Sequence, residues 1–128
     1  MSMTKDLEQA CMHCIMRVPS TSRVLRKLSK ENAFFFFTSI GNYTGEIAAS
    51  LEEFLEEIRE IDIRSLEFHL HRGDFEKWIA ETLGDKELAE EIKNLQDLRP
   101  AGDALRNQLV LIVSKRHEKL LKLRKVTK

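Results

Sequence analysis

Two Gly-Asp steps, at residues 73–74 and 84–85, constrain the fold of this chain more than any other feature. Glycine readily adopts the left-handed conformation that ends a helix, and aspartate is a preferred cap for the start of the next one. Each step therefore predicts the end of one helix and the start of another. Apolar residues between the steps recur at helical spacing. We expect short amphipathic helices whose apolar faces meet around Trp78, the only tryptophan.

The same signals extend along the whole chain of 128 residues, which contains only two prolines and five glycines. Such a composition favours helix, and the length suits one domain. Caps and apolar spacing mark helices at residues 4–18, 50–60, 65–72, 74–83, 85–97 and 103–125. We therefore predict an all-α fold, a single compact domain over residues 1–128 with five or six amphipathic helices.

Residues 33–38 are the exception, because they include four consecutive phenylalanines. Aromatic side chains on all sides leave no face for solvent, which predicts a short extended segment buried on both sides. A strand needs a hydrogen-bonding partner, in the fold or in a second chain. Within the chain only residues 66–71 alternate like a strand; caps at Ser65 and Gly73 favour helix there, and both alternatives stay open. Residues 38–45 are predicted to form a polar loop.

Charged side chains are segregated along the chain, although its net charge is zero. Residues 1–33 carry a net charge of +3, residues 34–97 of −10 and residues 98–128 of +7. Oppositely charged segments attract, so we expect the basic ends to fold back on the acidic middle. The alternative is that the last helix contacts an anionic partner such as nucleic acid. Its candidate anion contacts are Lys115, Arg116, Lys119, Lys122, Arg124 and Lys125.

The candidate ligand or partner contacts lie near the first Gly-Asp step and in the polar loop. His69, Arg72 and Asp74 have the side chains of a general base, an anion-binding group and an orienting carboxylate. Tyr43 in the loop is the fourth candidate, as a contact for a small polar ligand. A structural interpretation accounts equally for Asp74 as a helix cap and for His69 as a half-buried polar residue. We prefer the structural interpretation, and no catalytic residue is assigned.

Metal, cofactor and membrane binding are not predicted. Cys11 and Cys14, together with His69 and His71, have the residue types of a zinc site, but both cysteines lie on the apolar face of the helix predicted at 4–18. Glycine patterns for phosphates or dinucleotides are absent, and no apolar run is long enough to span a membrane. The charged start of the chain is unlike a signal peptide, so we expect a cytoplasmic protein with free thiols.

A string of motifs occupies residues 33–97. The motifs are Phe-x-Phe, Gly-x-x-x-Gly, Ser-Leu-x-Glu-Phe, Phe-His-x-x-Arg-Gly-Asp-Phe-x-x-Trp-Ile and Leu-Gly-Asp-x-x-Leu-Ala-x-x-Ile. This string resembles a prokaryotic family of unknown function, closely over residues 33–97 and loosely to about residue 123. The resemblance implies a helical binding or regulatory module and carries no established activity. Most of the shared residues are explained as core or caps, the exceptions being His69 and Arg72.

The leading functional prediction is therefore a non-enzymatic cytoplasmic module that interacts with, or regulates, a protein partner. A homodimer is expected to form through the phenylalanine segment or through the last helix. The first alternative is nucleic-acid contact through the basic helix at 103–125. The second is a small-ligand or hydrolytic site around His69 and Arg72.

Overall fold

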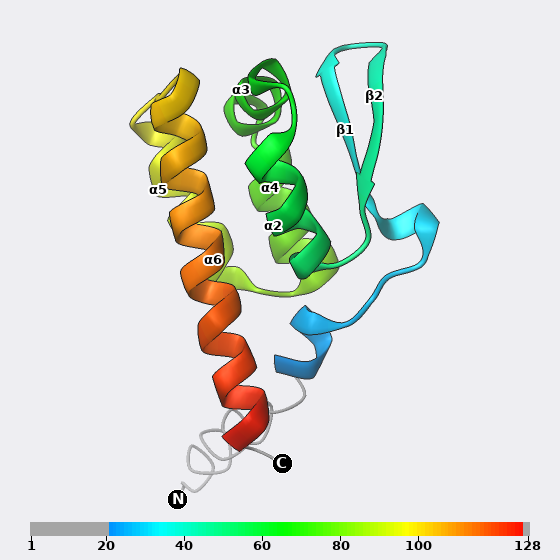
Figure 1. The fold of residues 1–128 in the computed structure, drawn as a ribbon, viewed down its shortest axis with the longest axis vertical. Helices are drawn as coiled ribbons and strands as arrows, with labels where there is room; N and C mark the ends of the chain where they lie inside the picture. The colour runs from blue at the N-terminus through cyan, green and yellow to red at the C-terminus, as the bar shows by residue number, and fades with distance from the viewer. Residues whose placement is uncertain (1–20, 127–128) are drawn as a thin grey trace, which may run out of the picture.

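The structure is a computed structural model that describes residues 21–126 (Figure 1). After a helical segment at residues 21–25, a 3-10 turn, η1, covers Lys30–Asn32. The remaining elements are β1 (Phe34–Ser39), β2 (Asn42–Ala48), α2 (Leu51–Glu60), α3 (Ile63–Arg72), α4 (Asp74–Lys77), the π-helix η2 (Trp78–Leu83), α5 (Lys86–Asp97) and α6 (Gly102–Val126). The helix predicted at 4–18, with both cysteines, lies outside the described residues.

The fold is mostly helical, as predicted, but the all-α prediction is wrong in one respect, because β1 and β2 form a two-stranded antiparallel sheet. The phenylalanine segment is a strand. Its partner, β2, begins inside the segment 38–45 that was expected to be a polar loop. The turn is held by a hydrogen bond between Asn42 and Ser39, and the Thr44 hydroxyl donates to the Phe36 carbonyl at 2.8 Å. Most side chains of β2 are exposed, so its sequence lacks the apolar alternation that predicts a strand.

Helices α2 and α3 begin at side-chain caps. The predicted cap of α2 is confirmed: the Ser50 hydroxyl accepts a hydrogen bond from the Glu53 amide at 3.1 Å. Residues 66–71 are helix rather than strand, which settles that alternative. The cap of α3 is not Ser65, however, but Asp62, whose carboxylate accepts from the Arg64 amide at 2.9 Å. Ser65 lies buried within the first turn, and its hydroxyl has no hydrogen-bond partner among the described residues.

The two Gly-Asp steps separate helices, but their aspartates play different roles. Gly73 and Gly84 have φ values of 81° and 86°, in the left-handed region that ends α3 and η2. Asp85 caps α5, as predicted, by accepting from the Leu88 amide at 3.1 Å. Asp74 does not cap its helix: no side-chain cap bond is formed at the start of α4. The prediction that Asp74 caps a helix is therefore wrong, because its carboxylate contacts His69 and Arg72 of α3 instead.

An aromatic core surrounds Trp78, as the helical pattern predicts. The Trp78 side chain is 8% exposed, and its indole donates a hydrogen bond to the Asn32 carbonyl at 2.9 Å. The rings in contact with it or with one another belong to Phe34, Phe36, Phe54 and Phe75. In Figure 1, α2, α3 and α4 lie between the hairpin on one side and α5 with α6 on the other. The hairpin thus covers one face of a helical domain.

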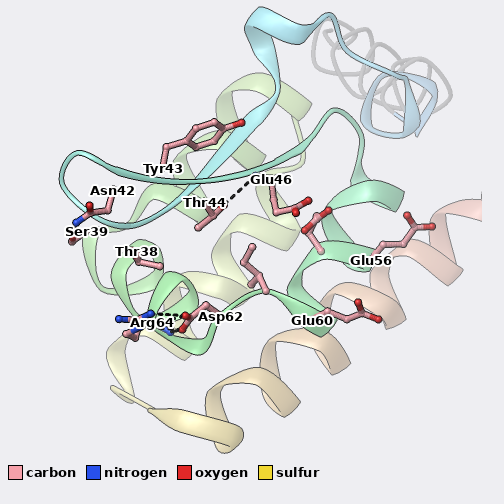
Figure 2. A pocket seen from close by; sticks show the side chains of 12 residues that line it. Thr38, Ser39, Asn42, Tyr43, Thr44, Glu46, Glu56, Glu60, Asp62 and Arg64 are labelled. Carbon is pink, nitrogen blue, oxygen red and sulfur yellow. Dashed lines mark hydrogen bonds and ion pairs between the residues drawn. The ribbon is translucent and has the colours of Figure 1, made fainter.

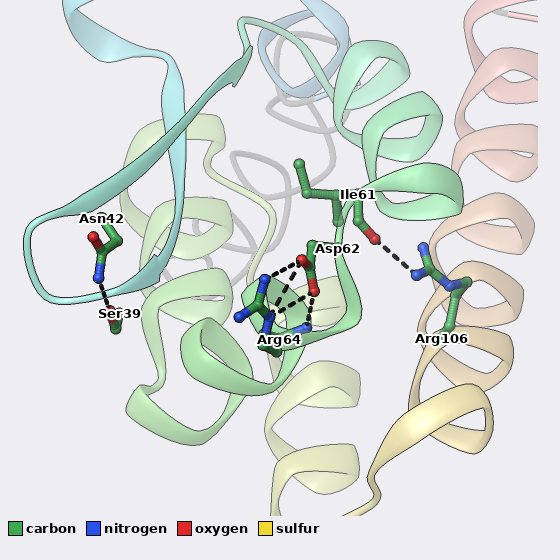
Figure 3. Close-up of polar contacts among 6 residues, drawn as sticks. All are labelled: Ser39, Asn42, Ile61, Asp62, Arg64 and Arg106. Carbon is green, nitrogen blue, oxygen red and sulfur yellow. Dashed lines mark hydrogen bonds and ion pairs between the residues drawn. The ribbon is translucent and has the colours of Figure 1, made fainter.

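Helix α6 is the longest element and runs along the domain from one end to the other (Figure 1). Its N-terminal amide, at Gly102, donates to the Glu67 carboxylate at 2.9 Å. Arg106 donates to the carbonyl of Ile61 at 2.7 Å (Figure 3). It also donates to the carbonyl of Ile58 at 2.9 Å, and the two bonds satisfy carbonyls at the C-terminal end of α2. None of the helices within residues 21–126 is both long and apolar enough to cross a membrane.

Candidate functional site

An aromatic pocket lies beside β1, where the C-terminal end of α3 and the start of α4 and η2 approach the hairpin. Its volume of about 480 Å³ falls in the range typical of ligand-binding cavities. Its lining residues are Ala33, Phe34, Phe35, Phe37, Ser39, Ile40, Gly41, Phe68, His69, Arg72, Asp74, Lys77, Trp78, Glu81 and Thr82. Three of the four predicted contacts, His69, Arg72 and Asp74, therefore meet at one cavity.

His69 is buried in the wall of this pocket, and both of its ring nitrogens are hydrogen-bonded. The Phe37 amide donates to Nε2 at 2.8 Å, and Nδ1 lies 2.8 Å from an oxygen of Asp74. A backbone amide can only donate, so Nε2 is unprotonated and Nδ1 carries the proton that Asp74 accepts. Burial lowers the pKa of His69 and outweighs the Asp74 carboxylate, which acts in the opposite direction. The imidazole is therefore neutral, with no lone pair directed into the pocket.

Two cationic side chains line the pocket, and one of them is paired with a carboxylate. Arg72 donates from Nε to Asp74 at 3.0 Å, and its guanidinium lies 4.9 Å from the centre of the Phe68 ring. Lys77, one turn after Asp74, makes no ion pair with another residue of the described part of the chain. Glu81, one turn further along, has no ion pair there either. The pocket therefore combines an aromatic lining with one cation, Lys77, and one carboxylate, Glu81, that make no ion pair within the described residues.

Tyr43 does not reach the aromatic pocket. It lies on β2, about half exposed, with its ring 5.8 Å from that of Phe35 and 5.4 Å from that of Phe37. Lys77 and Phe68 also line the aromatic pocket but were not predicted as site residues. The available signal was their spacing, because Lys77 is three residues from Asp74 and Phe68 is four from Arg72, on shared helix faces.

A second, larger cavity of about 1260 Å³ is lined by the hairpin, the C-terminal half of α2 and the start of α3, and Tyr43 lies at its edge (Figure 2). Its acidic residues are Glu46, Glu56, Glu57, Glu60 and Asp62. Asp62 is paired with Arg64 at 2.8 Å. Burial raises the pKa of Glu57 to about 7, with further contributions from the carboxylates of Glu46, Glu60 and Glu56. Glu57 therefore holds its proton to a higher pH than an ordinary carboxyl group does.

Replacing Glu57 with glutamine is expected to stabilise the domain above pH 7. A carboxyl group whose pKa is raised on folding stabilises the fold below its unfolded pKa, near 4.5, and this contribution is lost as the pH rises through about 7. After discounting for solvent screening, we expect Glu57→Gln to add on the order of 1 kcal/mol at pH 8 and almost nothing at pH 4. Urea denaturation at both pH values measures the difference.

The control for this substitution is Glu52→Gln, on the exposed side of the same helix and outside the cavity. It removes the same charge from α2 but should show no gain that grows with pH. Equal pH dependence in the two variants would contradict a local origin at Glu57.

The candidate anion contacts on α6 are partly occupied within the protein. Arg116 donates to the two carboxylate oxygens of Asp85 at 2.7 and 3.0 Å and lies 3.2 Å from Glu87. Lys119 is 3.9 Å from the same glutamate. Lys115, Lys122, Arg124 and Lys125 are exposed. The basic helix therefore folds against acidic residues of α5 at this level, and Arg116 is not available to an external anion.

Within residues 21–126, no group of three or more histidine, cysteine, aspartate or glutamate side chains is arranged to hold a metal ion.

No curated protein and no solved structure matches the chain. A sequence model of a family of unknown function, DUF5752, matches residues 31–128. That match covers most of the chain and confirms the expectation of a family of unknown function; the chain belongs to the DUF5752 family.

Proposed function

We propose that this domain is a non-enzymatic interaction module that binds a short apolar segment of a partner protein in the aromatic pocket. The state of His69 carries the proposal: both ring nitrogens are used by Phe37 and Asp74. An imidazole in that state cannot accept a proton from a substrate without breaking a hydrogen bond of the fold. Its role is to hold β1 against α3, which shapes the pocket wall. The same two hydrogen bonds argue against a hydrolytic site, because His69 was the candidate general base for that chemistry.

The lining of the pocket favours an apolar side chain followed by a carboxylate. Phe35, Phe68 and the edge of Trp78 provide apolar surface, and Ile40 stands exposed at the hairpin turn beside them. Recognition of apolar side chains is usually combined with a few polar groups that fix orientation. Of the two cations at the pocket, Lys77 is the one without an ion-pair partner within residues 21–126, so a carboxylate next to the apolar side chain complements it. The expected partner is therefore a segment with a large apolar residue beside Asp or Glu.

Trp78 provides a direct test, because it is the only tryptophan and it lines the pocket. Titration with short peptides that contain Phe-Glu or Leu-Glu should change its fluorescence, whereas peptides with Lys in place of Glu should bind at least roughly tenfold more weakly. Lys77→Glu should reverse this preference. Lys122→Glu, the same change on α6, should leave it unaltered.

Amide chemical shifts give a second measurement on the same titration. The largest changes should fall on the Phe37 amide and its neighbours at the pocket. Binding of neither peptide at millimolar concentration, or shifts confined to α6, would contradict the proposal.

A further inference from the structure

Helix α6 carries more apolar surface than the domain core can cover. Residues 109–113 are five consecutive apolar residues, so they point to all sides of the helix. Leu109 and Val113 are buried in the core, whereas Leu111 is 48% exposed. Leu98, the residue that directly follows α5, is 78% exposed. Val110 and Ile112 pack partly against the core, so Leu111 and Leu98 are the apolar side chains that this outer face leaves for a partner surface.

The exposed residues belong to a groove between α5 and α6, with a volume of about 430 Å³. We call it the α5–α6 groove; it is lined by Glu87, Glu91, Asn94, Leu95, Leu98, Gln108, Leu111, Ile112, Lys115, Arg116 and Lys119. In Figure 1, α5 and α6 lie on the side of the domain away from the hairpin. The groove and the aromatic pocket are therefore separate surfaces.

The two walls of the groove carry opposite charges. The α5 wall presents Glu87 and Glu91, and the α6 wall presents Lys115 and Lys119. Lys119 already lies 3.9 Å from Glu87. Glu91 and Lys115 make no ion pair with any residue of the described chain, so their charges remain available for a partner. The groove thus has an apolar centre between an acidic wall and a basic wall.

We propose that a second copy of this chain occupies the α5–α6 groove and forms a homodimer. A twofold interface places a surface against itself, so the surface must be complementary to its own copy. A groove with one acidic and one basic wall meets this requirement. A partner of a single charge would be attracted by one wall and repelled by the other, which favours a second copy over a uniformly acidic or basic partner.

The charge pattern also selects the direction of the twofold axis. An axis along the helices places the α5 wall of one copy on the α6 wall of the other, so that Glu91 faces Lys115 of the second copy. An axis across the helices places acidic wall on acidic wall, which like-charge repulsion disfavours. The two α6 helices therefore run parallel in the dimer, with Leu111 and Leu98 of both copies at its centre.

Sedimentation equilibrium of the full chain, from micromolar to millimolar concentration, tests this inference. We expect a monomer–dimer equilibrium, and we expect Leu111→Asp to weaken it by at least roughly tenfold, because a charge then enters the apolar centre. Ile40→Asp is the control, since it places the same charge on an exposed apolar residue of the hairpin. Circular dichroism and Trp78 emission show that each variant is folded.

Charge reversal tests the arrangement without altering the apolar centre. Lys115→Glu and Glu91→Lys should each weaken the dimer several-fold, whereas the double variant should restore it, because the two charges then exchange places. A chain that stays monomeric at millimolar concentration overturns the proposal. So does a dimer that is indifferent to Leu111→Asp. Neither result bears on the aromatic pocket, which is tested separately by peptide binding.

Discussion

Replacing Asp85 with alanine is expected to destabilise the domain by about 3–5 kcal/mol, the largest effect of any single polar substitution proposed. The Asp85 side chain is 2% exposed, and it caps α5 through the Leu88 amide. It also accepts two hydrogen bonds from Arg116, a side chain that is only 14% exposed. Alanine removes the cap and both hydrogen bonds of Asp85 to Arg116, so that this largely buried guanidinium keeps only the exposed Glu87, at 3.2 Å, as its ion-pair partner. Urea denaturation followed by Trp78 fluorescence measures the loss.

Two further variants separate the contributions of the cap and the ion pair. Asp85→Asn keeps a side-chain oxygen that can cap α5 but removes the charge, so its cost should come mainly from Arg116. Adding Arg116→Met removes the cation that has lost its buried partner, and the double variant should therefore be more stable than the sum of the two single losses indicates. A cost below about 1 kcal/mol for Asp85→Ala would show that Arg116 finds water or another carboxylate instead.

The Gly-Asp steps made the helical part of this fold predictable, because helix ends are determined by residues close together in the sequence. The hairpin was not predictable in the same way. Strand β2 has mostly exposed side chains, and it is a strand because β1 pairs with it. The cap of α3 shows another limit, since Asp62 and Ser65 are both good capping residues three positions apart. Only burial of Ser65 under the fold distinguishes them.

The site depended even more on contacts that are distant in sequence. His69 is 32 residues from Phe37, and no local pattern links a histidine on a helix to a backbone amide on a strand. Asp74 was predicted as a cap because aspartate after glycine is a common helix start. The left-handed turn at Gly73 instead brings its carboxylate within 2.8 Å of the His69 ring. The residues around Asp74 are compatible with a helix cap and with a partner for His69, and the turn at Gly73 places Asp74 beside His69.

Replacing His69 with leucine is expected to cost about 3 kcal/mol at pH 7.5. The Phe37 amide would lose its acceptor, and an unsatisfied group of this kind costs about 1–3 kcal/mol. Asp74 would also lose one of its donors, although it keeps the hydrogen bond from Arg72. His69→Gln and His69→Asn separate the two bonds. The glutamine oxygen lies near the position of Nε2 and can accept from Phe37, whereas the asparagine nitrogen lies near Nδ1 and can donate to Asp74. Each should therefore be less destabilising than leucine; equal losses in all three variants would contradict these assigned roles.

The pH dependence of the same variants tests whether the imidazole is neutral in the folded protein. Burial lowers the pKa of His69, while the unfolded chain keeps the ordinary value near 6.5. Below about pH 6.5 the unfolded state binds a proton that the folded state excludes. The stability from neutral His69 is therefore complete above this pH and declines as the pH falls toward the folded pKa, by at most about 1.4 kcal/mol per pH unit. The variants lack this proton-binding group, while Glu57, whose pH dependence has the opposite sign, is common to all of them. The stability difference between wild type and each variant should thus shrink from pH 7.5 to pH 5. A constant difference would mean that folding leaves the pKa of His69 unchanged, and a difference that grows toward pH 5 would mean that His69 is charged in the fold.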